Sequence, residues 1–275
     1  MMAIAPRNSI SKVTVPMPGP IRLISTDFDG TIVSRTSEPA LDRDCMELIR
    51  RLQGEGTVWA MNTGRSVELL QTGLEDFGFP IYPDFILTSE RDVHRPTAKG
   101  RQWEPFGDWN ERCAREHAIL FSSAASILKD VIHFVNSDTN ARILYESHGP
   151  AGLITASEKE MDRVVEFINA AKAHQPQFNY QRNTVYLRFC HTDYHKGAVL
   201  GELARLLEIE RAGIFAAGDH HNDISMLDGK FAALTACPAN AIPEVKAAVR
   251  KSGGYVATKN HGAGVYEALK FFLAP

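Results

Sequence analysis

The order of apolar segments predicts an α/β protein in which a parallel-sheet core is interrupted by an α+β module. Three observations predict this arrangement. Short apolar runs alternate with helical patterns over residues 21–88, the alternation stops over residues 89–190, and it returns over residues 191–275. Strands and helices that alternate at this spacing imply right-handed crossovers and therefore a parallel sheet.

The first half of the core is expected to contain three strands and two helices. Residues 21–28 form a short apolar run that ends in acidic residues and Gly30, which predicts a buried strand followed by a tight turn. The next elements are a helix at 39–53, a strand at 57–62, a helix at 66–77 and a strand at 84–88. Ser66 is a candidate N-cap for the second of these helices.

Residues 89–190 have a different pattern. A polar stretch with proline and glycine comes first, and helical stretches follow to about residue 135. Alternating segments near residues 141–145 and 152–155 predict a hairpin, residues 157–173 predict an amphipathic helix, and residues 178–180 and 184–189 predict a second hairpin. Clustered hairpins and helices indicate a separate α+β module.

The second half of the core repeats the first rhythm. The expected strands are 213–218, 231–236 and 255–257, and the expected helices are 196–207, one starting at 224–227, 242–249 and 264–273. The insert of about 100 residues would therefore leave one α/β domain and return to it.

Composition narrows the class of partner. The net charge of -3 provides no global basic field, so a nucleic acid partner is not expected. No stretch approaches the ~20 consecutive apolar residues of a membrane span. The four cysteines are isolated, as is common for reduced thiols, which together with the other features predicts a cytoplasmic protein. Residues 1–20 contain four prolines and no signal pattern, so a disordered leader is expected there. The oligomeric state stays open.

Four polar motifs lie where a predicted strand ends or a predicted helix begins. They are Asp27-Phe28-Asp29-Gly30-Thr31, Asn62-Thr63-Gly64-Arg65, His195-Lys196-Gly197 and Gly218-Asp219-His220-His221-Asn222-Asp223. In an open α/β sheet these edges converge on one crevice. Any one motif alone has an ordinary structural explanation as a turn, a helix cap or a solvated lysine, but the ordered set points to one site.

The four motifs supply complementary chemical groups. Two carboxylates at one strand end, Asp27 and Asp29, allow one to attack while the other handles a proton. Backbone amides and a hydroxyl at Thr63-Gly64 can bind a phosphate oxygen. A lysine can neutralise the phosphoryl group, and the carboxylates of the fourth motif suit a hard cation such as Mg²⁺.

This set resembles the haloacid dehalogenase superfamily, whose members are mostly phosphatases. The position of the insert, between the second and third motifs, resembles the branch with Cof-type and sucrose-phosphatase-like enzymes. The resemblance implies a Rossmann-like core over residues 21–88 and 191–275 and an inserted α+β cap domain over residues 89–190. It also implies a Mg²⁺-dependent phosphomonoesterase that acts on a small phosphorylated metabolite, with a sugar phosphate as the favoured class, through an aspartyl phosphate.

The resemblance assigns a role to each motif residue. Asp27 would be the nucleophile and Asp29 the general acid/base. Thr63, Gly64 and Lys196 would hold the transferring phosphoryl group. The metal would be held by Asp27, the backbone carbonyl of Asp29, and Asp219, with its shell oriented by Asp223. Asn222 would contact phosphate or support its loop.

One segment departs from the pattern of the family. Many relatives carry Asn-Gly-Ala after the third strand, where this chain has Ser89-Glu90-Arg91. The segment leads into the insert, which would close over the site as a lid and contact the leaving group. Arg91 and Arg188 are among the candidate lid residues that would bind substrate.

Two other functions are compatible with the sequence. A phosphomutase resembles the same superfamily and differs only in the fate of its aspartyl phosphate. A non-catalytic metabolite-binding relative would keep the fold but lose a nucleophile or metal carboxylate. Because Asp27, Asp29, Lys196, Asp219 and Asp223 are all present, the enzyme is the favoured interpretation.

Overall fold

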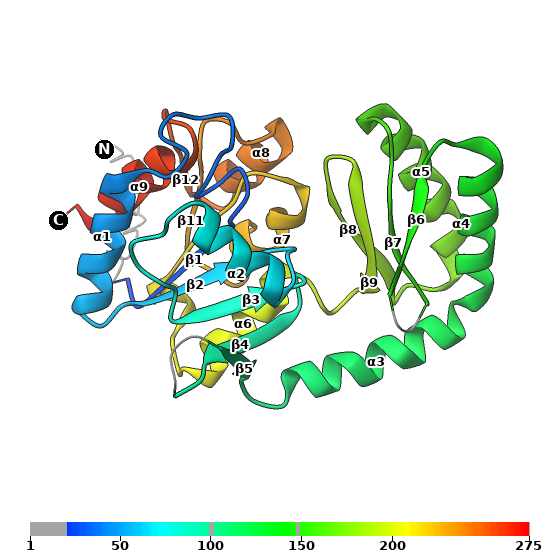
Figure 1. Ribbon diagram of the computed structural model, residues 1–275, viewed down its shortest axis with the longest axis horizontal. Helices are drawn as coiled ribbons and strands as arrows, with labels where there is room; N and C mark the ends of the chain where they lie inside the picture. Colours follow the sequence, from blue (N-terminus) through cyan, green and yellow to red (C-terminus); the bar gives the residue numbers. More distant parts are fainter. Residues whose placement is uncertain (1–20, 99–101, 147–148, 275) are drawn as a thin grey trace, which may run out of the picture.

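Two β-sheets organise the protein (Figure 1). The computed structural model describes residues 21–98, 102–146 and 149–274. The larger sheet has eight strands in the order β12-β11-β10-β1-β2-β3-β4-β5, and the smaller has four in the order β6-β7-β9-β8. The expected leader, residues 1–20, lies outside the described residues.

The centre of the larger sheet is parallel, as predicted. β1 (Leu23–Thr26) lies between β10 (Ile214–Ala217) and β2 (Val58–Asn62), and all three run in the same direction. The parallel strands farther out are β3 (Phe85–Thr88), β11 (Leu234–Cys237) and β12 (Tyr255–Val256). The carboxyl ends of these strands therefore meet at one edge, where crevices form in such sheets.

Helices cover both faces of this sheet. Side chains alternate along β1, so Ile24 packs into one hydrophobic layer and Leu23 into the other. The first layer includes α1 (Arg43–Gly54), α2 (Val67–Asp76) and α9 (His261–Leu273). The second includes α6 (Lys196–Leu206), α7 (Ile224–Leu227) and α8 (Pro243–Lys251). The result is a three-layer core, which confirms the α/β fold class that the sequence predicts.

Side-chain caps set where the first two helices begin. Asp42 Oδ1 accepts a hydrogen bond from the backbone N–H of Cys45 at 2.8 Å, so α1 begins at Arg43 and not at residue 39. Ser66 accepts from the N–H of Leu69 at 3.3 Å and is the N-cap that the sequence predicts for α2. A cap of this kind stabilises a helix by about 1 kcal/mol.

The core sheet extends farther along the chain than expected. β4 (Asp92–Pro96) and β5 (Trp103–Pro105) fall in the range that the sequence analysis assigned to the insert, yet β4 pairs antiparallel with β3 and β5 with β4. The chain reverses at Ser89 and Glu90, both at positive φ, and returns beside β3. The expectation that the insert begins at residue 89 is therefore wrong for these two strands, because the turn returns them to the core sheet. The domain boundaries that the sequence predicts otherwise stay a prediction.

The insert builds its own layer of helices on the smaller sheet. Its strands are β6 (Arg142–Glu146), β7 (Gly149–Ile154), β8 (Phe178–Asn183) and β9 (Tyr186–His191), and its helices are α3 (Trp109–Ser123), α4 (Ala125–Asp138) and α5 (Glu158–Ala171). Leu187 and Phe189 of β9 belong to the hydrophobic cluster with α4 and α5. Alternation along the strand turns Tyr186 and Arg188 to the opposite face. Figure 1 shows α3 leading from the core to the insert, and α4 and α5 on the side of the small sheet away from the core.

None of the helices that the structure describes is by itself long and apolar enough to cross a membrane. The pair α3 and α4 passes that test only when taken together, with a 71° bend between them.

Candidate active site

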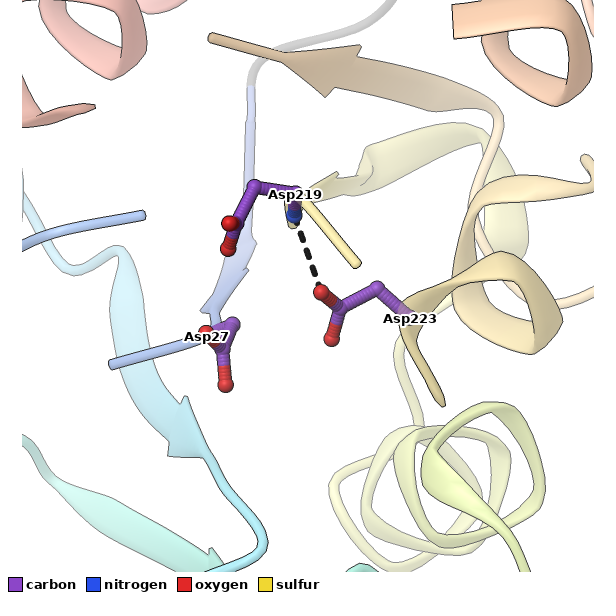
Figure 2. Close-up of side chains that lie close together, drawn as sticks. All are labelled: Asp27, Asp219 and Asp223. Carbon is purple, nitrogen blue, oxygen red and sulfur yellow. Dashed lines mark hydrogen bonds between the residues drawn. The ribbon is translucent and has the colours of Figure 1, made fainter. Parts of the chain in front are cut away.

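Three carboxylates meet at the carboxyl edge of the parallel sheet. Asp27 follows β1, and Asp219 and Asp223 lie in the loop after the neighbouring strand β10. Each offers one oxygen to a group whose ligand atoms all lie within 4.8 Å of one another. Figure 2 shows their side chains directed toward a shared space.

The loop after β10 is held in shape by its own side chains. Asp223 Oδ2 accepts from the backbone N–H groups of Asp219 and His220, each at 2.9 Å, and the first of these bonds is drawn in Figure 2. Thr31 donates its hydroxyl to Asp219 Oδ1 at 2.7 Å and so ties the first motif to the fourth. Gly30 has φ +83°, and a Cβ atom there would lie 2.4 Å from Asp219 Oδ2. Only glycine fits this turn.

Lys196 connects two of the three carboxylates. It is the first residue of α6, is 0% exposed, and donates from Nζ to Asp27 Oδ1 and to Asp223 Oδ1, each at 2.6 Å. The start of α6 is fixed by a bond from Asn62 Nδ2 to the Lys196 carbonyl at 3.0 Å. A charge this deeply buried is stable only when paired, and the two carboxylates supply the pairing.

The cluster contains three carboxyl groups and one ammonium group, so the carboxylates repel one another. Burial raises the pKa of Asp27, although Lys196 opposes this, and burial together with Asp223 raises the pKa of Asp219 to about 7. Burial alone would lower the pKa of Lys196, but Asp223 and Asp27 outweigh it and raise that pKa, so the side chain is an ammonium. Three carboxylates around one ammonium form an oxygen donor set that fits a hard divalent cation.

Asp29 lies apart from this cluster. Both of its carboxylate oxygens accept from Arg65, from Nε and Nη2, each at 2.7 Å, and its side chain is 47% exposed. The Arg65 guanidinium lies 4.7 Å from the centre of the Phe28 ring, which fixes its plane. The second motif contains Arg65, but the sequence assigned it no role. The prediction that the Asp29 carbonyl holds a metal stays a prediction.

The second motif adjoins Glu90 and the fourth motif. Thr63 is 2% exposed, and its carbonyl accepts from the N–H of Glu90 at 3.0 Å. A Cβ atom on Gly64 would lie 3.3 Å from Glu90 Oε1. The same oxygen accepts from Asn222 Nδ2 at 2.7 Å, so the donor with which Asn222 was expected to contact phosphate is engaged by Glu90 here.

Comparisons with known proteins agree with this geometry. A profile of the haloacid dehalogenase-like hydrolases matches residues 121–269, more than half of the chain. The chain belongs to this hydrolase family. A Bacillus subtilis (strain 168) protein named "Putative phosphatase YxeH" is 22% identical over 90% of this chain and 97% of its own length.

Solved structures share the fold. The sucrose-phosphatase of Synechocystis sp. PCC6803, in complex with sucrose and phosphate, superposes with a TM-score of 0.68 at 18% identity, over 93% of this chain and 100% of that chain. The SMU.1108c protein of Streptococcus mutans UA159 gives a TM-score of 0.66 at 18% identity over the same shares. These comparisons confirm the hydrolase family that the motifs predicted, and the α/β fold class that the order of apolar segments predicted.

The two arginines predicted to bind substrate border a separate cavity near the insert. Arg91, Arg188 and Glu146 are among the residues that line a space of about 180 Å³ between α3 and the small sheet. Arg188 donates from Nη1 to Glu146 Oε1 at 2.7 Å, and its side chain is 13% exposed. Arg188 therefore lines this cavity as part of an ion pair with Glu146. Their contact with substrate stays a prediction.

The insert of this hydrolase touches the core at the fourth motif. Thr184, in the turn between β8 and β9, lies with its hydroxyl 3.2 Å from His220 Nε2, and its N–H donates to His220 Nδ1 at 3.4 Å. His220 follows Asp219 directly, so the tip of the hairpin lies beside the acidic cluster. The sequence left His220 as a loop residue, because no local pattern shows which distant turn will contact it.

Proposed function

We propose that this protein is a Mg²⁺-dependent phosphomonoesterase of small phosphorylated metabolites, with a sugar phosphate as the favoured substrate and Asp27 as the nucleophile. The observation that carries the proposal is the position of Asp27. It is 5% exposed, bonded to the Lys196 ammonium, and adjacent to two further carboxylates. A carboxylate buried in such a set contributes little to stability, whereas it can act as a nucleophile on phosphorus.

The cation would be held by Asp27, Asp219 and Asp223, with the carbonyl of Asp29 as a further candidate ligand. A bound Mg²⁺ offsets the repulsion between an anionic nucleophile and the phosphate oxygens. Lys196 adds a fixed positive charge to the same space, and Thr63 and Gly64 offer a hydroxyl and an amide at the edge of β2.

The covalent steps can then be assigned to residues of this chain. An oxygen of Asp27 attacks phosphorus, the bond from phosphorus to the ester oxygen breaks, and Asp29 gives its proton to the leaving alkoxide. Asp29 then takes a proton from water, the water oxygen attacks phosphorus, and the bond from phosphorus to the Asp27 oxygen breaks, which releases inorganic phosphate and restores the Asp27 carboxylate. Because Arg65 binds both oxygens of Asp29, this acid/base role requires that one oxygen be released toward the leaving group.

Phosphate release from 4-nitrophenyl phosphate and from a panel of sugar phosphates tests the proposal. Asp27→Asn should abolish turnover on all esters while the fold is kept, with Asp44→Asn on the exposed side of α1 as the matched control. EDTA should abolish turnover and Mg²⁺ restore it, whereas Ca²⁺ should restore it poorly because its coordination is looser and higher. Near-normal turnover by Asp27→Asn, or by wild type in excess EDTA, would contradict the mechanism.

A further inference from the structure

The turn after β3 places the carboxylate of Glu90 against the second and fourth motifs. Ser89 and Glu90 both adopt left-handed backbone conformations, with φ of 52° and 64°. Residues other than glycine rarely adopt this conformation, and two in succession persist only where the surroundings impose them. The turn therefore costs conformational free energy, which contacts with the surrounding structure must offset.

Glu90 is buried and only half satisfied. It is 3% exposed, and Oε1 accepts from Asn222 Nδ2 at 2.7 Å. Among the described residues, Oε2 has no hydrogen-bond partner, and neither does the carbonyl oxygen Oδ1 of Asn222. The orientation of the Asn222 amide follows from this contact, since its oxygen would be repelled by the carboxylate. Glu90 Oε2 and Asn222 Oδ1 are therefore two buried acceptors without a donor among the described residues.

The surroundings of Glu90 place it between the phosphoryl site and the insert. On the core side it adjoins Gly64 and lies within the electrostatic influence of Lys196. On the insert side it lies within the electrostatic influence of Arg188 and Tyr186, which extend from the face of β9 opposite to α4 and α5. A phosphate ester bound at Asp27 would direct its leaving group into this region.

The chemistry of the two acceptors selects the ligand. A phosphate dianion brings only acceptors and cannot satisfy Glu90 Oε2 or Asn222 Oδ1. A hydroxyl group brings the O–H donor that Glu90 Oε2 and Asn222 Oδ1 lack, so it can satisfy either acceptor. We infer that Glu90 is a specificity-determining residue that binds a hydroxyl group of the leaving alcohol. This inference rests on the proposed phosphatase function.

Glu90→Gln tests the inference with little change in volume. The variant can still accept from Asn222 through its carbonyl oxygen, but it places an N–H₂ donor where Oε2 was. Glucose 6-phosphate, fructose 6-phosphate and ribose 5-phosphate serve as probes, and 4-nitrophenyl phosphate is the ester without hydroxyl groups. We expect kcat/KM for the best sugar phosphate to fall by on the order of tenfold to a hundredfold more than kcat/KM for the aryl ester. Glu104→Gln, on exposed β5, is the matched control and should change neither.

The outcomes separate this inference from the function on which it rests. Equal losses on both kinds of ester would show that Glu90 only supports Asn222 or the fold, and would overturn the inference alone. Turnover of the aryl ester with none of the sugar phosphates would overturn the substrate class. A wild-type protein that releases phosphate from neither kind of ester would contradict the proposed function itself, and the inference with it.

Discussion

At the scale of single residues, the site depends on buried ion pairs, and a substitution of either partner would break them. Lys196 is 0% exposed and donates to both Asp27 and Asp223 at 2.6 Å, so these two carboxylates share one ammonium. Removing one partner of a buried pair costs far more than the pair contributes, because it leaves an uncompensated charge. Asp27 is therefore placed by electrostatics as much as by the sheet.

Arg65 is the residue whose effect on Asp29 is most open to test. Lysine cannot reproduce a two-point contact with a carboxylate, so Arg65→Lys should misplace Asp29 while it keeps the charge. We expect kcat on a sugar phosphate to fall by about tenfold to a hundredfold with little change in KM. The fall should be smaller for 4-nitrophenyl phosphate, whose leaving group needs less help from an acid.

Arg50→Lys, at an exposed pair on α1, is the control for that measurement. If Arg65→Lys lowers kcat equally for the two esters, Arg65 acts on the phosphoryl group or the fold and not through Asp29.

At the scale of elements, a buried imidazole connects a helix and a strand of the insert. His117 of α3 is 5% exposed, lies 2.9 Å from the Cys113 carbonyl through Nδ1, and accepts from the N–H of His191 at 3.1 Å through Nε2. These contacts assign the proton to Nδ1 and connect α3 to β9. Burial and the nearby charge of Arg91 lower the pKa of His117 to about 4.

This lowered pKa predicts a loss of stability in acid. The unfolded chain takes up a proton on His117 near pH 6.5, whereas the folded chain does so only near pH 4. The contribution is therefore fully present above about pH 6.5 and is lost as the pH falls toward 4. Between these limits the free energy of unfolding of wild type should fall by about 3 kcal/mol more than that of His117→Gln. Urea unfolding from pH 4 to pH 8 measures this difference, with exposed His133→Gln on α4 as the control. Parallel pH profiles for wild type and His117→Gln would contradict it.

At the scale of the whole molecule, the candidate catalytic groups come from both sides of the insert. Asp27 and Thr63 precede it and Lys196 and Asp219 follow it, so the chain leaves and re-enters the core at the edge that carries the chemistry. The contact of Thr184 with His220 shows the insert resting on that edge. We therefore expect the insert to close over bound substrate and to meet the leaving group.

Substitutions on the insert should then change the choice of substrate. Arg188→Ala should lower kcat/KM for a sugar phosphate several-fold more than for 4-nitrophenyl phosphate, because the aryl ester is small and needs few contacts with the insert. Arg182→Ala, which removes an ion pair with Asp162 of α5, is a matched control within the same sheet. Equal losses on both esters in Arg188→Ala would assign this arginine to the fold, and the specificity role would have to be abandoned.

The parallel core, the insert and the convergence of Asp27, Lys196, Asp219 and Asp223 could all be predicted from the sequence. This was possible because strand ends in a parallel sheet share one edge, and because these residues follow local apolar patterns. Three features were decided only by tertiary structure: the pairing of Asp29 with Arg65, the return of β4 and β5 to the core sheet, and the burial of Glu90 against Asn222. Glu90 and Asn222 are 132 residues apart. No local pattern encodes such a contact, because it arises from the way a strained turn and a distant loop pack together once the sheet has formed.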